Sequence, residues 1–188
     1  MFHFSIVIFS CWVIFWLYWL ISAFGSKRNI GPSIRRFAGI RIVIIILALV
    51  LFRLLNTQNY SFENHIAANN ETLQTAGLII FLLGLLLAVW ARLHLGRNWG
   101  MPMSQKQDPE LVTSGPYHYI RHPIYSGILL AMLGTAIALS IYWLLIFAVS
   151  AVYFIYSAGV EEQLMLRQFP KVYQLYKSKT KMLIPFIF

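Results

Sequence analysis

The sequence predicts an all-α integral membrane protein with five transmembrane helices, and three observations support this prediction. The chain has 188 residues, of which 59% are hydrophobic and only 11% are charged, whereas a soluble domain carries about 25% charged residues. Several apolar runs approach the roughly 20 residues that a helix needs to cross a bilayer. The basic residues gather between these runs. The length is that of a single domain, residues 1–188.

The predicted spans follow the apolar runs in order. The first three cover Phe4–Phe24, Ile40–Leu55 and Leu73–Leu95. The run Ile124–Val160 then holds 37 residues without a charge. That is too long for one crossing of ~30 Å at about 1.5 Å per residue. It is predicted to fold as a helical hairpin, with the reversal near Leu139-Ser140-Ile141.

Charge asymmetry predicts how the spans are oriented. Basic residues cluster after the first span, between the third and fourth spans, and after the fifth span, whereas the loop Asn56–Thr72 has two glutamates and no Lys or Arg. Because positively charged loops stay in the cytoplasm, the N-terminus is predicted outside. The segment around Arg121 and the C-terminal tail are predicted in the cytoplasm. There, Glu161–Lys181 alternates apolar and charged residues at helical spacing, which indicates an amphipathic helix near the membrane face.

Several function classes are excluded. The net charge of +9 does not indicate nucleic-acid binding, because the basic residues lie between apolar runs rather than on one soluble face. His94, His118 and His122 match no zinc spacing, and the one cysteine, Cys11, lies inside an apolar run, so no metal site is predicted. The apolar run at the N-terminus has neither a basic region before it nor a small-residue cleavage site, which favours a retained helix over a signal peptide.

The most informative segment places Arg121-His122-Pro123 at the start of the charge-free run. Proline is favoured at the first position of a helix, so His122 is predicted to be the N-cap. The N–H groups of Ile124 and Tyr125 then lie at the positive end of the helix dipole. Such an end, with the added charge of Arg121, can bind a carboxylate or phosphate. An ordinary capped helix with an interfacial arginine is the alternative interpretation.

Tyrosines and glutamates flank this segment in the sequence. Tyr117, Tyr119 and Tyr125 are either anchors at the membrane interface or rings of a pocket that stacks an adenine or surrounds a cation. Glu161 and Glu162 arrive where the fifth span ends. Adjacent helical residues point about 100° apart, so one of the two is predicted to face inward. It either pairs with a nearby Lys or Arg or grips ribose hydroxyls or a cationic ligand.

Four segments resemble the isoprenylcysteine carboxyl methyltransferase family, part of a wider group that includes phospholipid N-methyltransferases. In order, they are Leu95–Trp99, Glu110–Tyr117, Arg121–Tyr125, and Glu161-Glu162 with Phe169 and Tyr173. The resemblance covers about the C-terminal half, from Arg92 to Pro185. It implies S-adenosylmethionine as the cofactor, S-adenosylhomocysteine as its product, and a lipid or lipidated substrate that arrives from the bilayer.

Carried over residue by residue, the resemblance implies a cofactor site at the cytoplasmic side. Its contacts would be Ser104, Leu111, Val112, Tyr117, His122, Pro123, Ile124, Tyr125 and Glu161. The candidate catalytic residues are Glu161, Glu162 and Arg121. On this interpretation residues 1–72 form two N-terminal spans and residues 73–188 form the cofactor-binding catalytic half.

One position departs from the resemblance. Relatives that methylate prenylcysteine carry an arginine one helical turn before the first glutamate, whereas this chain has Ser157, which supplies neither the charge nor the forked donors of arginine. The predicted acceptor is a prenylcysteine-type carboxylate, with a phospholipid amine or a small thiol as alternatives. A membrane reductase that uses NADPH is a rival interpretation, although such reductases are usually longer. A non-enzymatic membrane protein is another, but it leaves the ordered motifs unexplained.

Overall fold

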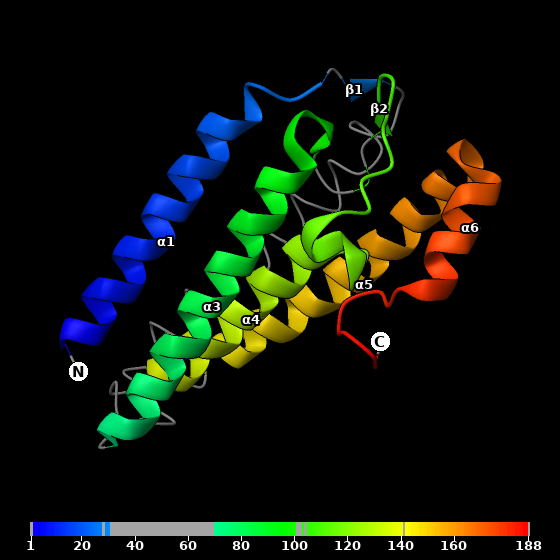
Figure 1. Cartoon of the computed structure of the whole chain (residues 1–188). Helices are drawn as coiled ribbons and strands as arrows, with labels where there is room; N and C mark the ends of the chain where they lie inside the picture. Colours follow the sequence, from blue (N-terminus) through cyan, green and yellow to red (C-terminus); the bar gives the residue numbers. More distant parts are fainter. Residues whose placement is uncertain are drawn as a thin grey trace.

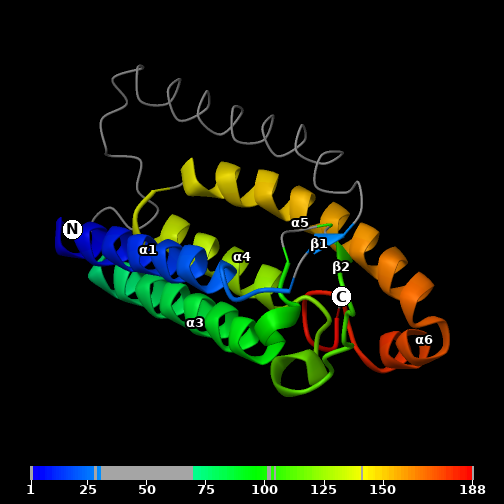
Figure 2. The same ribbon diagram turned by 90° about the horizontal axis from the view of Figure 1, so that it is seen from above.

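Apolar side chains dominate the long helices of the structure (Figure 1). This computed structural model describes residues 2–27, 29–30, 70–100, 103, 105–140 and 142–187. The helices are α1 (Phe2–Ala23), α3 (Glu71–Leu95), α4 (Pro123–Ala138), α5 (Tyr142–Gln168) and α6 (Pro170–Lys179). Two 3₁₀ turns, η1 (Gly96–Asn98) and η2 (Gly115–His118), lie in the chain between α3 and α4. Helices α1, α3, α4 and α5 are roughly aligned, and α6 turns back at the end of α5 (Figure 1, Figure 2).

The contact between α3 and α4 is made by small residues, which lets the two backbones touch. A Cβ atom on Gly84 would lie 2.3 Å from the backbone nitrogen of Ala131, and one on Gly134 would lie 2.3 Å from that of Phe81. Gly77 and Gly127 meet the facing helix in the same way. Membrane helices use small residues for such close approach, because lipid offers no hydrophobic drive for association. The two helices therefore pack with their backbones in direct contact.

Polar contacts attach α1 to this pair at two levels. Near its middle, the indole N–H of Trp12 donates to the hydroxyl of Thr135 at 3.2 Å. At the other level, the buried Arg92 donates to the carbonyl of Ser22 at 2.6 Å. The guanidinium of Arg92 also lies over the ring of Trp99, 4.7 Å from its centre. The bond from Arg92 holds the C-terminal ends of α1 and α3 together, and the bond from Trp12 joins α1 to α4.

Among the residues that the structure describes, three helices, α1, α3 and α5, are long and apolar enough to cross a membrane, which agrees with the predicted helical membrane protein. The fourth apolar helix, α4, has 16 residues, about 24 Å of helix. Helix α4 ends at Ala138 and α5 begins at Tyr142, whereas the hairpin reversal near Leu139-Ser140-Ile141 stays a prediction. The predicted second span, Ile40–Leu55, lies outside the described residues, and the five-span topology stays a prediction.

The prediction of one amphipathic helix over Glu161–Lys181 is wrong. Helix α5 continues through this region to Gln168, and α6 is a separate helix that begins at Pro170. A proline inside a helix loses a hydrogen bond and clashes with the preceding turn, and it pushes the residue before it out of the helical region. Accordingly, Phe169 has φ of −130° and ψ of 60°. The chain turns at this residue.

Short backbone pairings add to the helical fold that the sequence predicts. Residues 29–30 (β1) pair antiparallel with residues 105–106 (β2), and a pairing of two residues has no periodicity that a sequence could show. The C-terminal segment also pairs with the start of α4. The backbone N–H groups of Arg121 and His122 donate to the carbonyls of Lys181 at 2.9 Å and Met182 at 3.0 Å. The residues just after α6 therefore lie against the start of α4.

Candidate functional site

The site begins with the turn that starts α4. His122 is the N-cap of α4 and Pro123 takes the first helical position, which confirms this part of the prediction. The His122 side chain makes no capping hydrogen bond. The first helical bond at this end runs from the Ser126 N–H to the His122 carbonyl at 3.1 Å. The N–H groups of Ile124 and Tyr125 precede that bond and lie at the positive end of the helix.

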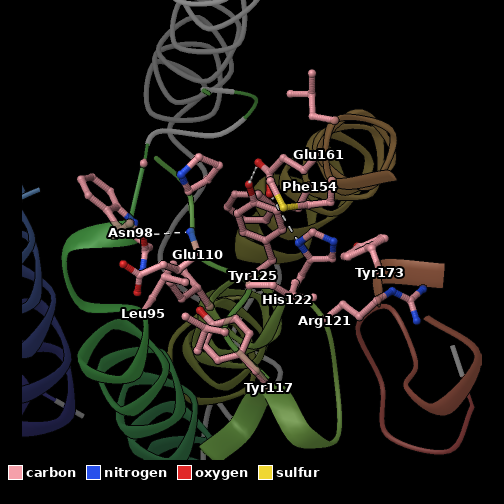
Figure 3. A pocket seen from close by; sticks show the side chains of 18 of the residues that line it. Leu95, Asn98, Glu110, Tyr117, Arg121, His122, Tyr125, Phe154, Glu161 and Tyr173 are labelled. Carbon is pink, nitrogen blue, oxygen red and sulfur yellow. Dashed lines mark hydrogen bonds and ion pairs between the residues drawn. The ribbon is translucent and has the colours of Figure 1, made fainter. Parts of the chain in front are cut away.

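A cavity of about 450 Å³ lies beside this turn, between parts of α1, α3, α4, α5 and α6 and the loop before η2 (Figure 3). Eight of the residues predicted from the sequence line it: Leu111, Val112, Tyr117, Arg121, His122, Ile124, Tyr125 and Glu161. Pro123 is fully buried in α4 and is not part of the wall, and Ser104 lies outside the described residues. Residues far apart in the sequence are thus brought to one cavity.

Glu161 carries the only carboxylate that α5 presents to the cavity. Its Oε1 accepts hydrogen bonds from the Tyr125 hydroxyl at 2.5 Å and from the Met103 N–H at 2.8 Å. Its Oε2 lies 3.5 Å from Nδ1 of His122. The side chain is 24% exposed. Glu161 is therefore both fixed by neighbours and accessible from the cavity.

Glu162 is instead buried in an ion-pair network behind the wall. Its Oε1 lies 2.6 Å from Nε of Arg121 and its Oε2 lies 2.5 Å from Nζ of Lys177. Arg121 also donates to the carbonyl of Thr180, and its guanidinium points away from Glu161 (Figure 3). The sequence left open which glutamate faces inward, and the structure answers that it is Glu161. Glu162 and Arg121 join α4, α5 and the end of α6.

His122 links the two glutamates. Nε2 lies 3.8 Å from Glu162 Oε1, so both ring nitrogens face carboxylates. Burial alone would lower the pKa of His122, but the neighbouring carboxylates of Glu161 and Glu162 outweigh it, and the pKa is raised above its ordinary value. The ring is stacked on Tyr125, with centres 5.4 Å apart, and Tyr125 is in turn stacked on Phe154 at 4.5 Å. Three parallel rings thus lie beside Glu161.

Further tyrosines belong to the cavity wall. Tyr117 and Tyr173 are buried, and the hydroxyl of Tyr176 donates to the Tyr117 carbonyl at 2.6 Å. Burial raises the pKa of Tyr176 to about 12, and it also raises the pKa values of Tyr117 and Tyr173. All three are therefore neutral near pH 7. Tyr119, which the sequence grouped with them, is 56% exposed and is not part of the cavity wall.

The cavity extends into an apolar part that the sequence did not reveal. Trp16 and Trp19 of α1 line it together with Ile128 of α4 and Tyr153 and Phe154 of α5. Tyr176 was also missed. The pairs Trp16/Trp19 and Tyr173/Tyr176 each have the three-residue spacing of one helix face. This spacing is a sequence signal for a shared surface, but it is equally typical of helix packing in a membrane. This part of the cavity is suited to an apolar chain.

The loop that carries Leu111 and Val112 is tied down at its start. Glu110 pairs with Lys27, which follows α1, at 2.8 Å. Asn98 donates to the same carboxylate at 3.4 Å. Hydrogen bonds from Lys27 and Asn98 lower the pKa of Glu110. Within the part of the chain that the structure describes, no three His, Cys, Asp or Glu side chains are grouped as metal ligands would be.

Fold and site together define a helical membrane protein with an aromatic, acidic cavity at one end of its spans. Residues 73–172 match the sequence profile of phospholipid methyltransferases, and the chain belongs to that family. Over 119 residues it is 34% identical to the protein-S-isoprenylcysteine O-methyltransferase of Xenopus laevis, a match that covers 61% of this chain and 41% of that protein. Over 118 residues it is 31% identical to the enzyme of the same name from Schizosaccharomyces pombe, covering 61% of this chain and 50% of the relative. The chain thus spans half or less of the length of these relatives.

Proposed function

We propose that this chain is an S-adenosylmethionine-dependent methyltransferase that acts on an acceptor held in the membrane. The observation that carries the proposal is the convergence of Glu161, His122 and Tyr125 on one cavity. All three lie within residues 73–172, the part that matches the family profile. Residues 73–188 are then the catalytic half, and residues 1–72 supply two N-terminal spans.

The chemistry of the polar end suits the cofactor. When bound, S-adenosylmethionine supplies an electrophilic methyl group on a positively charged sulfur. The parallel rings of Tyr125 and Phe154 offer faces that attract such a cation. Glu161 Oε1 already accepts two hydrogen bonds, which leaves Oε2 to accept from ribose hydroxyls or the methionyl amine. Leu111 and Val112 supply apolar wall for the adenine.

The start of α4 suits the methionyl carboxylate. The N–H groups of Ile124 and Tyr125 lie at the positive end of the helix, a ready site for an anion. The nitrogens of His122 face Glu161 and Glu162, so we assign His122 the role of holding Glu161 in place. Arg121 is held by Glu162, and we assign it the role of positioning His122 rather than contacting substrate.

The apolar part of the cavity suits an acceptor with a lipid chain. Trp16, Trp19 and Ile128 line it, so a chain that enters from the bilayer would bring its head group towards Glu161. We propose a prenylcysteine-type carboxylate as the acceptor, because both curated relatives are named for isoprenylcysteine. Ser157, fully buried one helical turn before Glu161, supplies no positive charge for a carboxylate. That observation favours a phospholipid amine or a small thiol as the second candidate.

The proposed reaction is a direct displacement. Held by Glu161 and the start of α4, the cofactor would supply its methyl group to a lone pair of the acceptor, and the electron pair of the broken carbon–sulfur bond would remain on sulfur. The residues of the chain align the two reactants. The aromatic rings around the reactants exclude water from them. If the acceptor is an amine, Glu161 is positioned to take its proton.

We further propose that the cavity and α6 face the cytoplasm and that the N-terminus lies outside. In the sequence, the basic residues gather after α1, after α3 and after α5, and Lys27, which follows α1, pairs with Glu110 of the cavity wall. Positive charge in short loops favours the cytoplasmic side. The cofactor is available on that side. Cysteine accessibility in intact cells, with a reagent that does not cross membranes, tests this orientation.

Calorimetry on the purified chain in detergent tests the function. We expect S-adenosylhomocysteine to bind and NADPH not to bind. Glu161→Gln should weaken the binding, whereas Glu71→Gln, at the opposite end of α3, should leave it unchanged. Binding of NADPH alone would favour a reductase, and binding of neither ligand would contradict the proposal. Transfer of labelled methyl groups to a farnesylcysteine analogue, phosphatidylethanolamine or a small thiol then identifies the acceptor.

A further inference from the structure

Helix α6 has two faces with different surroundings. On one face, Tyr173 and Tyr176 line the cavity. On the other, Val172 is 62% exposed and Leu175 is 60% exposed. A helix of ten residues therefore forms a cavity wall on one side and an unpartnered apolar strip on the other.

The position of α6 along α5 places that strip near the membrane surface. Nζ of Lys177 lies 2.5 Å from Oε2 of Glu162, and Glu162 comes just after the charge-free run that ends at Val160. The C-terminal part of α6 is thus level with the point where α5 leaves the hydrocarbon. Lipid head groups occupy the next several ångströms on each side of a bilayer.

Charge indicates what covers the strip. From Gln163 to Phe188 the chain has five basic residues and no acidic residue: Arg167, Lys171, Lys177, Lys179 and Lys181. Lys177 is paired with Glu162, whereas Lys179 and Lys181 are exposed. Exposed apolar side chains between exposed lysines are typical of helices that lie in the interface of anionic membranes.

We infer that the outer face of α6, with Lys179 and Lys181, docks on anionic phospholipid head groups and thereby holds Tyr173 and Tyr176 against the cavity. The contacts that transmit this are on the inner face, where Tyr176 bonds to Tyr117 and Lys177 bonds to Glu162. Anionic lipid then favours the arrangement in which Tyr173 and Tyr176 line the cavity. By linkage, it tightens the binding of a ligand in that cavity. Only the identity of that ligand rests on the proposed function.

A fluorescent probe on the outer face tests the docking. The label is attached at Ser178→Cys in a Cys11→Ala background, and the full chain is placed in nanodiscs of phosphatidylcholine, alone or mixed equally with phosphatidylglycerol. Head groups carrying a spin label should quench the probe more strongly in the anionic discs. Each interfacial lysine contributes about fivefold to the preference for anionic lipid. Lys179→Gln with Lys181→Gln should therefore reduce that preference by up to about 25-fold.

The matched control is Arg167→Gln with Lys171→Gln, which removes the same charge farther from Glu162. It should keep the preference. Equal quenching in both lipids, or equal losses in the two double variants, would overturn the docking; an acidic protein partner instead of lipid would give the first of these results.

Ligand affinity in the same discs tests the coupling. S-adenosylhomocysteine should bind at least about fivefold more tightly in the anionic discs, the lower end of ordinary coupling between two sites. Unchanged affinity together with an intact quenching response would overturn the coupling. Absence of binding in every disc, with the quenching response intact, would refute the proposed function but leave the docking established.

Discussion

Removal of the Glu162 carboxylate tests how the site is held together. Glu162 and Arg121 are bonded at 2.6 Å, and their side chains are only 3% and 7% exposed. Loss of one partner from a buried ion pair costs about 3–5 kcal/mol, because the other charge is left uncompensated. Lys177 is 43% exposed, so its pairing adds less than about 1 kcal/mol. Glu162→Leu should therefore destabilise the chain by about 3–5 kcal/mol.

Thermal unfolding in detergent measures this loss. A chain of this size loses about 2–4 °C in Tm per kcal/mol, so Tm should fall by about 6–20 °C. The double variant Arg121→Met/Glu162→Leu should recover part of the loss, because it leaves no unpaired charge in the buried site. Lys177→Gln should produce only a small shift. A Tm for Glu162→Leu within about 2 °C of the wild type would refute the argument, and so would a double variant less stable than the single one.

Three other predictions concern the frame, the site and its pH dependence. Gly84→Val should lower Tm in detergent markedly, because any Cβ meets the Ala131 backbone at 2.3 Å and such overpacking costs about 1–3 kcal/mol or more. The control Gly159→Ala, where an added Cβ meets nothing within 4 Å, should keep or raise Tm. Equal Tm values for the two variants would contradict the close packing of α3 on α4. Tyr125→Phe removes the 2.5 Å hydrogen bond to Glu161 and should weaken S-adenosylhomocysteine binding by about 10–100-fold in calorimetry; an unchanged Kd would count against the assignment. The pKa of His122 is raised above 6.5, so its protonated form stabilises the fold fully below about pH 6.5 and this contribution is lost as pH rises through the folded value. The Tm advantage of the wild type over His122→Gln should shrink accordingly, and an advantage that grows with pH would contradict the sign.

The sequence predicts the long helices closely because lipid selects for uninterrupted apolar runs. Leu73–Leu95 was expected and α3 covers Glu71–Leu95; Pro123 starts α4 as its fixed backbone angle requires. The break at Phe169 was missed although Pro170 signals it, because helical spacing continues on both sides. Apolar runs and helix-breaking prolines are local signals, because each depends only on residues that are close together in the sequence.

The parts of the site that depend on packing were less predictable. Glu161 and Glu162 differ by one residue, and which faces inward depends on how α5 is rotated against α4. The pairing of Arg121 with Glu162 joins positions 41 residues apart, and the contribution of Trp16 and Trp19 joins α1 to the opposite end of the chain. No local periodicity reports such contacts. The resemblance of ordered motifs supplied the cavity residues instead.

The contact between the C-terminal segment and the start of α4 determines when the cavity can form during synthesis. As a predicted span, α4 needs only its own apolar residues to enter the bilayer. However, the Ser126 hydroxyl donates to the Leu183 carbonyl at 2.6 Å, 57 positions later in the chain. The backbone N–H groups of Arg121 and His122 likewise donate to the carbonyls of Lys181 and Met182. Until translation has passed Leu183, the inserted helices lack the backbone partners that fix this turn. A chain that stops before residue 181 should thus reach the membrane with its spans in place and its cavity unfinished.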